Sequence, residues 1–263
     1  MHDDGIRIAM WSGPRNISTA MLRSWGNRPD AFVSDEPFYA YYLKATGIDH
    51  PGAAETIATY ETDWHAIADA LTGPIPGGKS VWYQKHMTHH MLPEVDLDWT
   101  EHVVNCFLIR SPQEMITSYI KVRPDPTLQD MGLAEQRAIF DHVRARTGAV
   151  PPVIDARDVL LDPARTLSLL CEAIGVPFTD AMLHWPAGKR RHRRHLGQVL
   201  VQRSGSVHRL RALPAQGRAG PGPAPAVAGR VQRALRRNVR TPHPLTAAAD
   251  ITPTRAGAAT PPS

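Results

Sequence analysis

The segment Ser12-Gly13-Pro14-Arg15-Asn16-Ile17-Ser18-Thr19 has the residue types of a phosphate-binding turn. It joins a short apolar run to a helical pattern, so free backbone N–H groups and the positive end of a helix dipole would face an anion there. Arg15 could add a guanidinium, and Ser18 and Thr19 could add hydroxyl donors. The segment lacks the G-x-x-x-x-G-K-[ST] pattern of the nucleotide loop. A plain strand-to-helix turn with Ser18 as N-cap therefore stays open.

The same turn resembles the P-[KR]-S-G-[ST]-T loop of sulfotransferases that use 3′-phosphoadenosine 5′-phosphosulfate (PAPS), with residues 14–19 in the matching positions. Asn16 and Ile17 replace the usual Ser and Gly, and the loss of that glycine restricts the backbone. Arg15 stands where the family has a lysine, so we expect it to stabilise leaving-group charge without transferring a proton. The resemblance implies that the 5′-phosphosulfate is bound by Gly13, Pro14, Arg15, Asn16, Ser18 and Thr19.

A second stretch, Arg110-Ser111-Pro112 followed by Ser118, resembles the R-x-P-x-x-x-x-x-S motif of the same family. In that family the arginine ends a strand, the serine lies on the following helix, and both bind the 3′-phosphate of PAPS. A guanidinium offers a bidentate fork and a hydroxyl offers a directional donor. The alternative is an arginine that merely ends a strand and a solvated serine.

Sulfuryl transfer needs a base for the acceptor, and the sequence offers two. Glu36, in Asp35-Glu36-Pro37, resembles the E-P loop of bacterial and carbohydrate sulfotransferases, where the glutamate faces the acceptor. His86 follows Lys85 roughly where cytosolic members carry a K-x-H base. Glu36 could instead cap a loop, and His86 could be structural. We expect no metal site in the His-rich segment 85–90, because adjacent histidines of a strand point to opposite faces and no partner has ligand spacing.

Aromatic side chains gather near these candidates and could either line an acceptor pocket or form core. They are Trp11, Trp25, Phe38, Tyr39, Tyr41 and Tyr42.

These residues must be positioned by a sheet, because strand and helix patterns alternate along the chain. Strands are predicted over residues 6–11, 31–34, 80–86, 103–109 and 153–155, and helices from Ser18 or Thr19 and over 53–71, 112–121, 133–147 and 163–174. The stretch from Asp155 to Phe178 resembles a scaffold segment of the family and carries no predicted chemistry. We expect one α/β domain over residues 5–187, with a P-loop-NTPase-like parallel sheet covered by helices.

The composition separates this body from the rest of the chain. Residues 1–188 hold 15 Lys and Arg against 24 Asp and Glu, whereas residues 189–263 hold 15 against one and include nine prolines. Such a composition predicts that 188–263 is a disordered basic tail. Residues 192–210 can be back-translated with permitted synonymous codons. Read with a shift of one base, these codons give TDGIWARYWYSAVEASTGF, which resembles the C-terminal region of bacterial sulfotransferase-like proteins. We therefore hypothesise a frameshift near Gly188.

The expected function is sulfuryl transfer from PAPS, as co-substrate, to a hydroxyl or amine of a small-molecule acceptor, without a metal. A small-molecule kinase, a catalytically inactive nucleotide-binding relative and a polyanion-binding module driven by the tail remain alternatives. The two cysteines lie in apolar runs, and no run of about 18 apolar residues or signal peptide is seen. We therefore expect a cytoplasmic protein with no specific nucleic-acid or membrane partner, and the oligomeric state stays open.

Overall fold

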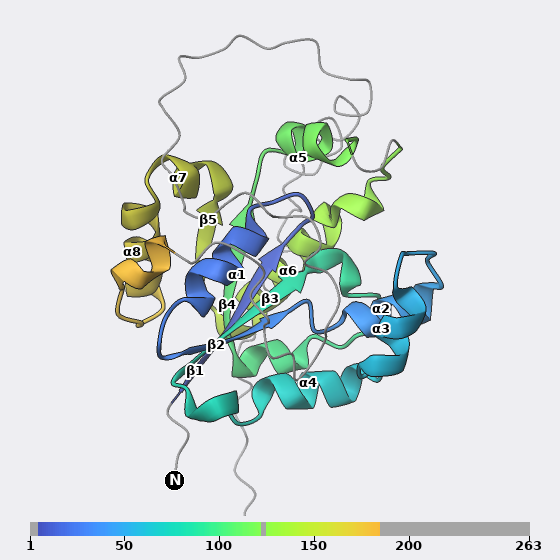
Figure 1. The fold of residues 1–263 in the computed structure, drawn as a ribbon, viewed down its shortest axis with the longest axis horizontal. Helices are drawn as coiled ribbons and strands as arrows, with labels where there is room; N and C mark the ends of the chain where they lie inside the picture. The colour runs from blue at the N-terminus through green and yellow to red at the C-terminus, as the bar shows by residue number, and fades with distance from the viewer. Residues whose placement is uncertain (1–4, 122–124, 185–263) are drawn as a thin grey trace, which may run out of the picture.

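A computed structural model of the protein describes residues 5–121 and 125–184 (Figure 1). The predicted basic tail, 188–263, and the hypothesised frameshift near Gly188 lie outside the described residues and remain predictions. In the described part of the chain, no helix is both long and apolar enough to span a membrane.

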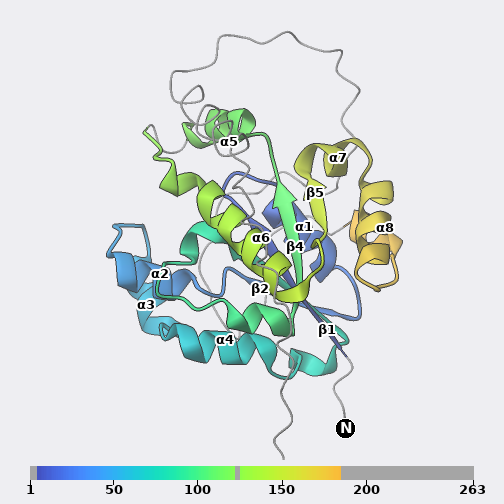
Figure 2. The same cartoon turned by 180° about the vertical axis from the view of Figure 1, so that it is seen from behind.

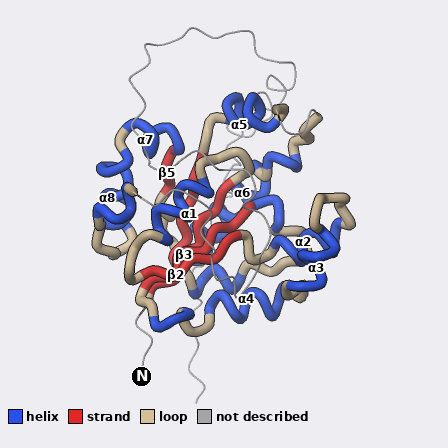
Figure 3. Tube along the Cα trace, viewed as in Figure 1, coloured by secondary structure: helices blue, strands red, loops and turns tan. Residues whose placement is uncertain are grey.

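Five parallel strands form one sheet in the order β2-β3-β1-β4-β5, so the predicted parallel α/β sheet is confirmed. Each strand overlaps a predicted one, because each is a short apolar run rich in residues that pack well in sheets. Helices surround the sheet on both sides (Figure 3). The strands are β1 (Ile6–Ser12), β2 (Ala31–Asp35), β3 (Val81–Met87), β4 (Val104–Ile109) and β5 (Val153–Asp155).

Two hydrophobic layers cover the sheet. One layer packs α1 (Ser18–Gly26), α7 (Ala156–Leu161) and α8 (Pro163–Ala173) against one face. The other packs α4 (Trp64–Thr72) and α6 (Leu133–Thr147) against the opposite face. Figure 1 shows α1 in front of the sheet, and Figure 2 shows α6 in front of it from behind. Helix α2 (Tyr39–Thr46) contributes Tyr41 to the second layer. Helices α3 (Ala53–Thr59) and α5 (Pro112–Tyr119) lie outside the two layers.

The period of two along each strand decides which side chains can meet the same layer. In β1, Met10 joins the core beneath α1, whereas Trp11 joins the core on the α6 side. In β3, Tyr83 packs on the α1 side and Trp82 on the other. Lys85 therefore shares the face of Tyr83, and the next residue faces the opposite way.

Three helical details differ from the sequence prediction. The helix expected over 53–71 is two helices, α3 and α4, and Asp63 caps the second by accepting from the His65 N–H. Helices α2 and α7 were not predicted, because both are short and contain strand-like aromatic or β-branched residues. Ser18 begins α1 as its first helical residue, and Ile17 is the N-cap without a side-chain hydrogen bond, so the N-cap alternative for Ser18 is wrong.

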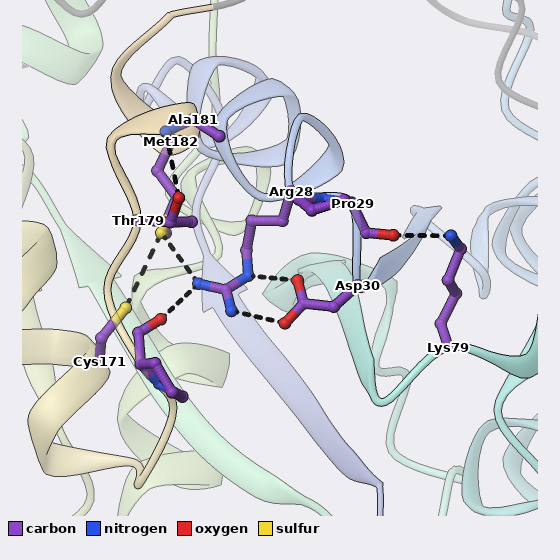
Figure 4. A network of polar contacts seen from close by, with 9 residues as sticks. Arg28, Pro29, Asp30, Lys79, Cys171, Thr179, Ala181 and Met182 are labelled. Atoms are coloured by element: carbon purple, nitrogen blue, oxygen red, sulfur yellow. Dashed lines mark hydrogen bonds and ion pairs between the residues drawn. The ribbon is translucent and has the colours of Figure 1, made fainter.

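The opposite end of α1 is fastened by Arg28 (Figure 4). Its guanidinium donates to both carboxylate oxygens of Asp30, at 3.0 and 2.8 Å, and to the Pro177 carbonyl at 2.7 Å. The hydrogen bond from Arg28 lowers the pKa of Asp30 against a smaller opposing effect of burial. This contact joins the α1–β2 connection to the segment after α8 and keeps α1 in a fixed position over the sheet.

Candidate active site

A cavity of about 630 Å³ opens at the carboxyl ends of the strands. Strand β1 lies between β3 and β4, and the loops leaving β1, β2, β3 and β4 all contribute to the cavity wall. This is the topological switch point, where open parallel sheets bind ligands. Of the predicted site residues, all but Gly13 and His86 line the cavity: Pro14, Arg15, Asn16, Ser18, Thr19, Glu36, Arg110 and Ser118.

Asn16 fixes the loop after β1 to the neighbouring strand. Its side-chain amide donates to the Leu108 carbonyl at 3.0 Å, and its side-chain oxygen accepts from the Ile17 N–H at 3.0 Å. Asn16 therefore gives the loop a fixed shape by side-chain hydrogen bonds, although the glycine of the resembling motif is missing here.

Gly13 contributes to the loop by its lack of a side chain. A Cβ added there would lie 2.6 Å from the backbone oxygen of Met131 and 2.8 Å from the Met115 side chain. The loop can therefore pack down on these residues only with glycine at this position. Gly13 itself does not line the cavity.

The two predicted phosphate-binding stretches are in direct contact. The Arg110 guanidinium donates to the backbone oxygen of Arg15 at 2.7 Å, and the Arg15 Nε donates to the Ser118 hydroxyl at 3.1 Å. Arg110 also pairs with Glu114, one turn into α5, at 3.0 Å. Residues about 100 positions apart thus bring two guanidinium groups to one wall of the cavity.

Two backbone outliers point to the same place. Arg15 and Glu36 have φ angles of 58° and 53°, and they are the only non-glycine residues with positive φ in the described part of the chain. Such a conformation costs about 1–3 kcal/mol per residue and is found mainly at functional sites. Glu36 also precedes Pro37, a position that favours extended backbone. Both outliers line the cavity, at the ends of β1 and β2.

Lys85 holds Glu36 in this conformation. The ammonium of Lys85 lies 2.7 Å from the Asp35 carboxylate and 2.5 Å from the Glu36 carboxylate, and the Glu36 N–H donates to the Lys85 carbonyl at 2.9 Å. Lys85 is only 3% exposed. Burial opposes its charge, but the two carboxylates outweigh burial and raise the pKa of Lys85 above its usual value. Lys85 therefore stays protonated and fixes the position of the Glu36 carboxylate.

His86 lies on the opposite face of β3 and does not line the cavity. Its ring stacks on Trp11 with centroids 4.5 Å apart and packs against Phe38 and Trp99. Burial lowers the pKa of His86 to about 3, so the ring is neutral at physiological pH. This geometry fits the alternative in which His86 is a structural residue of the core. The alternation of side chains along β3, which brings Lys85 to the cavity, places His86 in the core.

The aromatic group divides between cavity and core. Tyr39 and Tyr42 line the cavity. The other members are buried in the two cores, namely Trp11, Trp25, Phe38 and Tyr41.

Several cavity residues were not singled out from the sequence. Lys85 lies near the carboxyl end of the apolar strand β3, and the similar position of Glu36 at the end of β2 is a signal that could have identified it. His89 and His90 follow β3 on a short 3-10 turn, whose geometry the local pattern does not predict. Arg23 and Asp130 also line the cavity. No cluster of three or more metal-ligating side chains is found among the described residues.

A five-stranded parallel sheet with its cavity at the loop after β1 defines a P-loop-like α/β protein. The chain belongs to the family described as the sulfotransferase domain, which it matches over residues 6–235. This match extends past residue 187, and the predicted domain boundary stays a prediction.

The chain is also similar in sequence to two curated plant proteins and in fold to a solved domain. The chain is 36% and 34% identical, over 182 residues, to the branched-chain-amino-acid aminotransferase-like proteins 1 and 2 of Arabidopsis thaliana. Each match covers 69% of this chain but 32% of the relative, so the chain spans about a third of their length. The sulfotransferase domain from the curacin biosynthetic pathway shares the fold, with a TM-score of 0.52 and 14% identity, over 88% of this chain and 98% of that domain.

Proposed function

We propose that this protein transfers a sulfuryl group from PAPS to a hydroxyl or amine of a small acceptor. The observation that carries the proposal is the contact between Arg110 and the loop after β1. A nucleotide that bears phosphate at both its 3′ and 5′ positions needs two cationic sites held at a fixed separation. Arg110 with Ser118 offers the first, and Arg15 with the start of α1 offers the second.

The residues present fit the phosphorylated ends of such a nucleotide. The first backbone N–H groups of a helix have no partner within it, and α1 also starts without a side-chain cap. Ser18 and Thr19, in this first turn, line the cavity, so the N–H groups are available to an anion there. The Ser118 hydroxyl accepts from Arg15 and keeps its own proton for an anionic oxygen. A cavity of about 630 Å³ is also within the range that binds nucleotide-sized ligands.

PAPS, when bound, supplies an activated sulfuryl group and a bisphosphorylated nucleotide as leaving group. In the proposed reaction Glu36 accepts the proton of the acceptor hydroxyl or amine as the acceptor forms its bond to sulfur. Lys85 keeps the Glu36 carboxylate in place through their 2.5 Å ion pair. The Arg15 guanidinium stabilises the charge that develops on the departing phosphate oxygen. No residue in this scheme needs a metal ion.

A turnover assay tests the proposal. The purified chain is incubated with PAPS, a panel of alcohols, phenols and amines, and a metal chelator, and both released 3′-phosphoadenosine 5′-phosphate (PAP) and sulfated product are measured by chromatography. We expect both products in equal amounts without added metal, and a rate lower by about 10²- to 10⁴-fold with Glu36→Gln. Phosphorylated product from ATP and magnesium, with none from PAPS, would instead establish a small-molecule kinase.

A further inference from the structure

Beyond Glu36 the cavity continues along α2, in a part that we call the α2 lobe. Helix α2 follows β2 at one end of the sheet, whereas Arg110 follows β4 on the other side of β1. Figures 1 and 2 both show α2 and α5 well apart. The α2 lobe is lined by Tyr39, Tyr42, Leu43, Ile48, His50, His89 and His90.

Flat rings form the wall of the α2 lobe. His90 stacks on Tyr42 with centroids 4.7 Å apart and an interplanar angle of 29°, and it packs against Tyr39 at 5.3 Å and His89 at 4.5 Å. Leu43 and Ile48 add aliphatic surface. A wall of this kind favours a ligand with a flat, largely apolar ring.

Three buried polar atoms in this wall have no hydrogen-bond partner. They are the Tyr39 hydroxyl, the Nδ1 of His89 and the Nδ1 of His90, and His90 is only 2% exposed. A buried polar group without a partner costs free energy, so native proteins rarely leave one unpaired without a reason. The Tyr83 hydroxyl is equally unpaired but lies in the core beneath α1, away from the cavity. The lobe is distinct because the three side chains that carry these atoms all line the cavity.

The two histidines of the α2 lobe that follow β3, His89 and His90, are neutral. Burial lowers the pKa of His89 to about 4, against a smaller opposing effect of Asp130, and it lowers the pKa of His90 well below its usual value. Both imidazoles are therefore uncharged at pH 7. The Lys85 ammonium, which also lines the cavity, is paired with Asp35 and Glu36. An anionic ligand beside Glu36 would thus meet that carboxylate and the neutral rings of His89 and His90.

We infer that the α2 lobe binds the acceptor and selects an uncharged, flat-ringed hydroxyl compound that carries a second hydrogen-bonding group for Tyr39 and His90. This inference rests on the proposed function, because it assigns the acceptor side of the same cavity. The reacting hydroxyl points to Glu36, and the second polar group lies deeper along α2. Tyr39 and His90 are then specificity-determining residues, and His90 also keeps Tyr42 in position by stacking.

Calorimetry on the full chain saturated with PAP tests the inference with three probes of similar shape. They are 2,7-dihydroxynaphthalene, 2-naphthol and 7-hydroxy-2-naphthoate. We expect the dihydroxy compound to bind about five- to tenfold more tightly than 2-naphthol, the worth of one buried hydrogen bond, and the naphthoate to bind most weakly. Equal or tighter binding of the naphthoate, or no binding of any probe, would overturn the inference.

Variants separate a specific role from a structural one. Tyr39→Phe and His90→Phe keep a ring in the wall but remove its hydrogen-bonding atoms, so each should reduce the affinity for the dihydroxy probe to that for 2-naphthol and leave 2-naphthol unchanged. Tyr83→Phe removes an unpaired hydroxyl from the core and should change neither. An equal loss for both probes in Tyr39→Phe would refute the assignment. The affinity for PAP, measured in the same experiment, tests the proposed function separately.

Discussion

Replacing Arg110 by alanine should separate the two phosphorylated ends of the nucleotide. In the free protein Arg110 donates to the Arg15 carbonyl and to Glu114 and keeps further N–H donors for a ligand. The alanine variant loses those ligand donors and also the bond that orders the loop after β1. Both losses should reduce the affinity for a ligand with a 3′-phosphate, whereas only the second should reduce the affinity for a ligand without one.

The free energy of binding that corresponds to each loss follows from the structure. A hydrogen bond between a charged pair contributes about 1.5–3 kcal/mol net, and the 24% exposure of the Arg110 side chain favours the lower part of that range. One or two such bonds to a 3′-phosphate amount to about 2–4 kcal/mol, or roughly 30- to 1,000-fold in affinity for PAP. The lost bond to the Arg15 carbonyl is worth about 0.5–1.5 kcal/mol, or roughly two- to tenfold in affinity for adenosine 5′-phosphate.

Titration calorimetry with PAP and with adenosine 5′-phosphate measures the two effects. Arg137 provides the matched control, because it forms an equivalent ion pair one turn along α6, with Asp141 at 2.6 Å, and does not line the cavity. Arg137→Ala should leave both affinities unchanged. If Arg110→Ala weakened both nucleotides by the same factor, the assignment of Arg110 to the 3′-phosphate would be refuted.

Four other substitutions have defined outcomes. Glu36→Gln should reduce kcat about 10²- to 10⁴-fold and leave PAP affinity unchanged, and a normal kcat would exclude Glu36 as the base. His86→Asn should lower the melting temperature but keep kcat within a few-fold of that of the unmodified protein. A decrease in kcat as large as that of Glu36→Gln would instead show that His86 takes part in catalysis. Gly13→Ala should destabilise the fold by about 1–3 kcal/mol in thermal unfolding and weaken PAP binding, because its Cβ meets the Met131 oxygen; unchanged binding would contradict the role given to the loop. Arg28→Met should cost about 1–3 kcal/mol of stability without changing PAP affinity, and an equally stable variant would contradict the fastening of α1 by the Pro177 and Asp30 contacts.

The sheet could be predicted from the sequence because its signal is local. Each strand is a short apolar run, and the pattern of intervening helices dictates parallel pairing. The contact between Arg110 and the loop after β1 follows from the same reasoning, since carboxyl ends of neighbouring parallel strands meet at one edge of a sheet. The resemblance of the two motifs to those of sulfotransferases then predicted which strand ends lie together.

The remaining details depend on packing that no local pattern specifies. The choice between Lys85 and His86 is decided by the register of β3, and a shift of one residue exchanges the two faces. The left-handed backbone at Glu36, just before a proline, exists because Lys85 binds it through both backbone and side chain. Helix α2 was missed because its aromatic residues favour strands, while the core formed with Phe38 and Tyr41 favours a helix.

A crystal structure of the full chain with PAP tests the central claim most directly. The account predicts the 3′-phosphate within hydrogen-bonding distance of Arg110 and Ser118, and the 5′-phosphate at the loop after β1 and the first turn of α1. A nucleotide bound in the reverse orientation, or outside the cavity that these residues line, would contradict it.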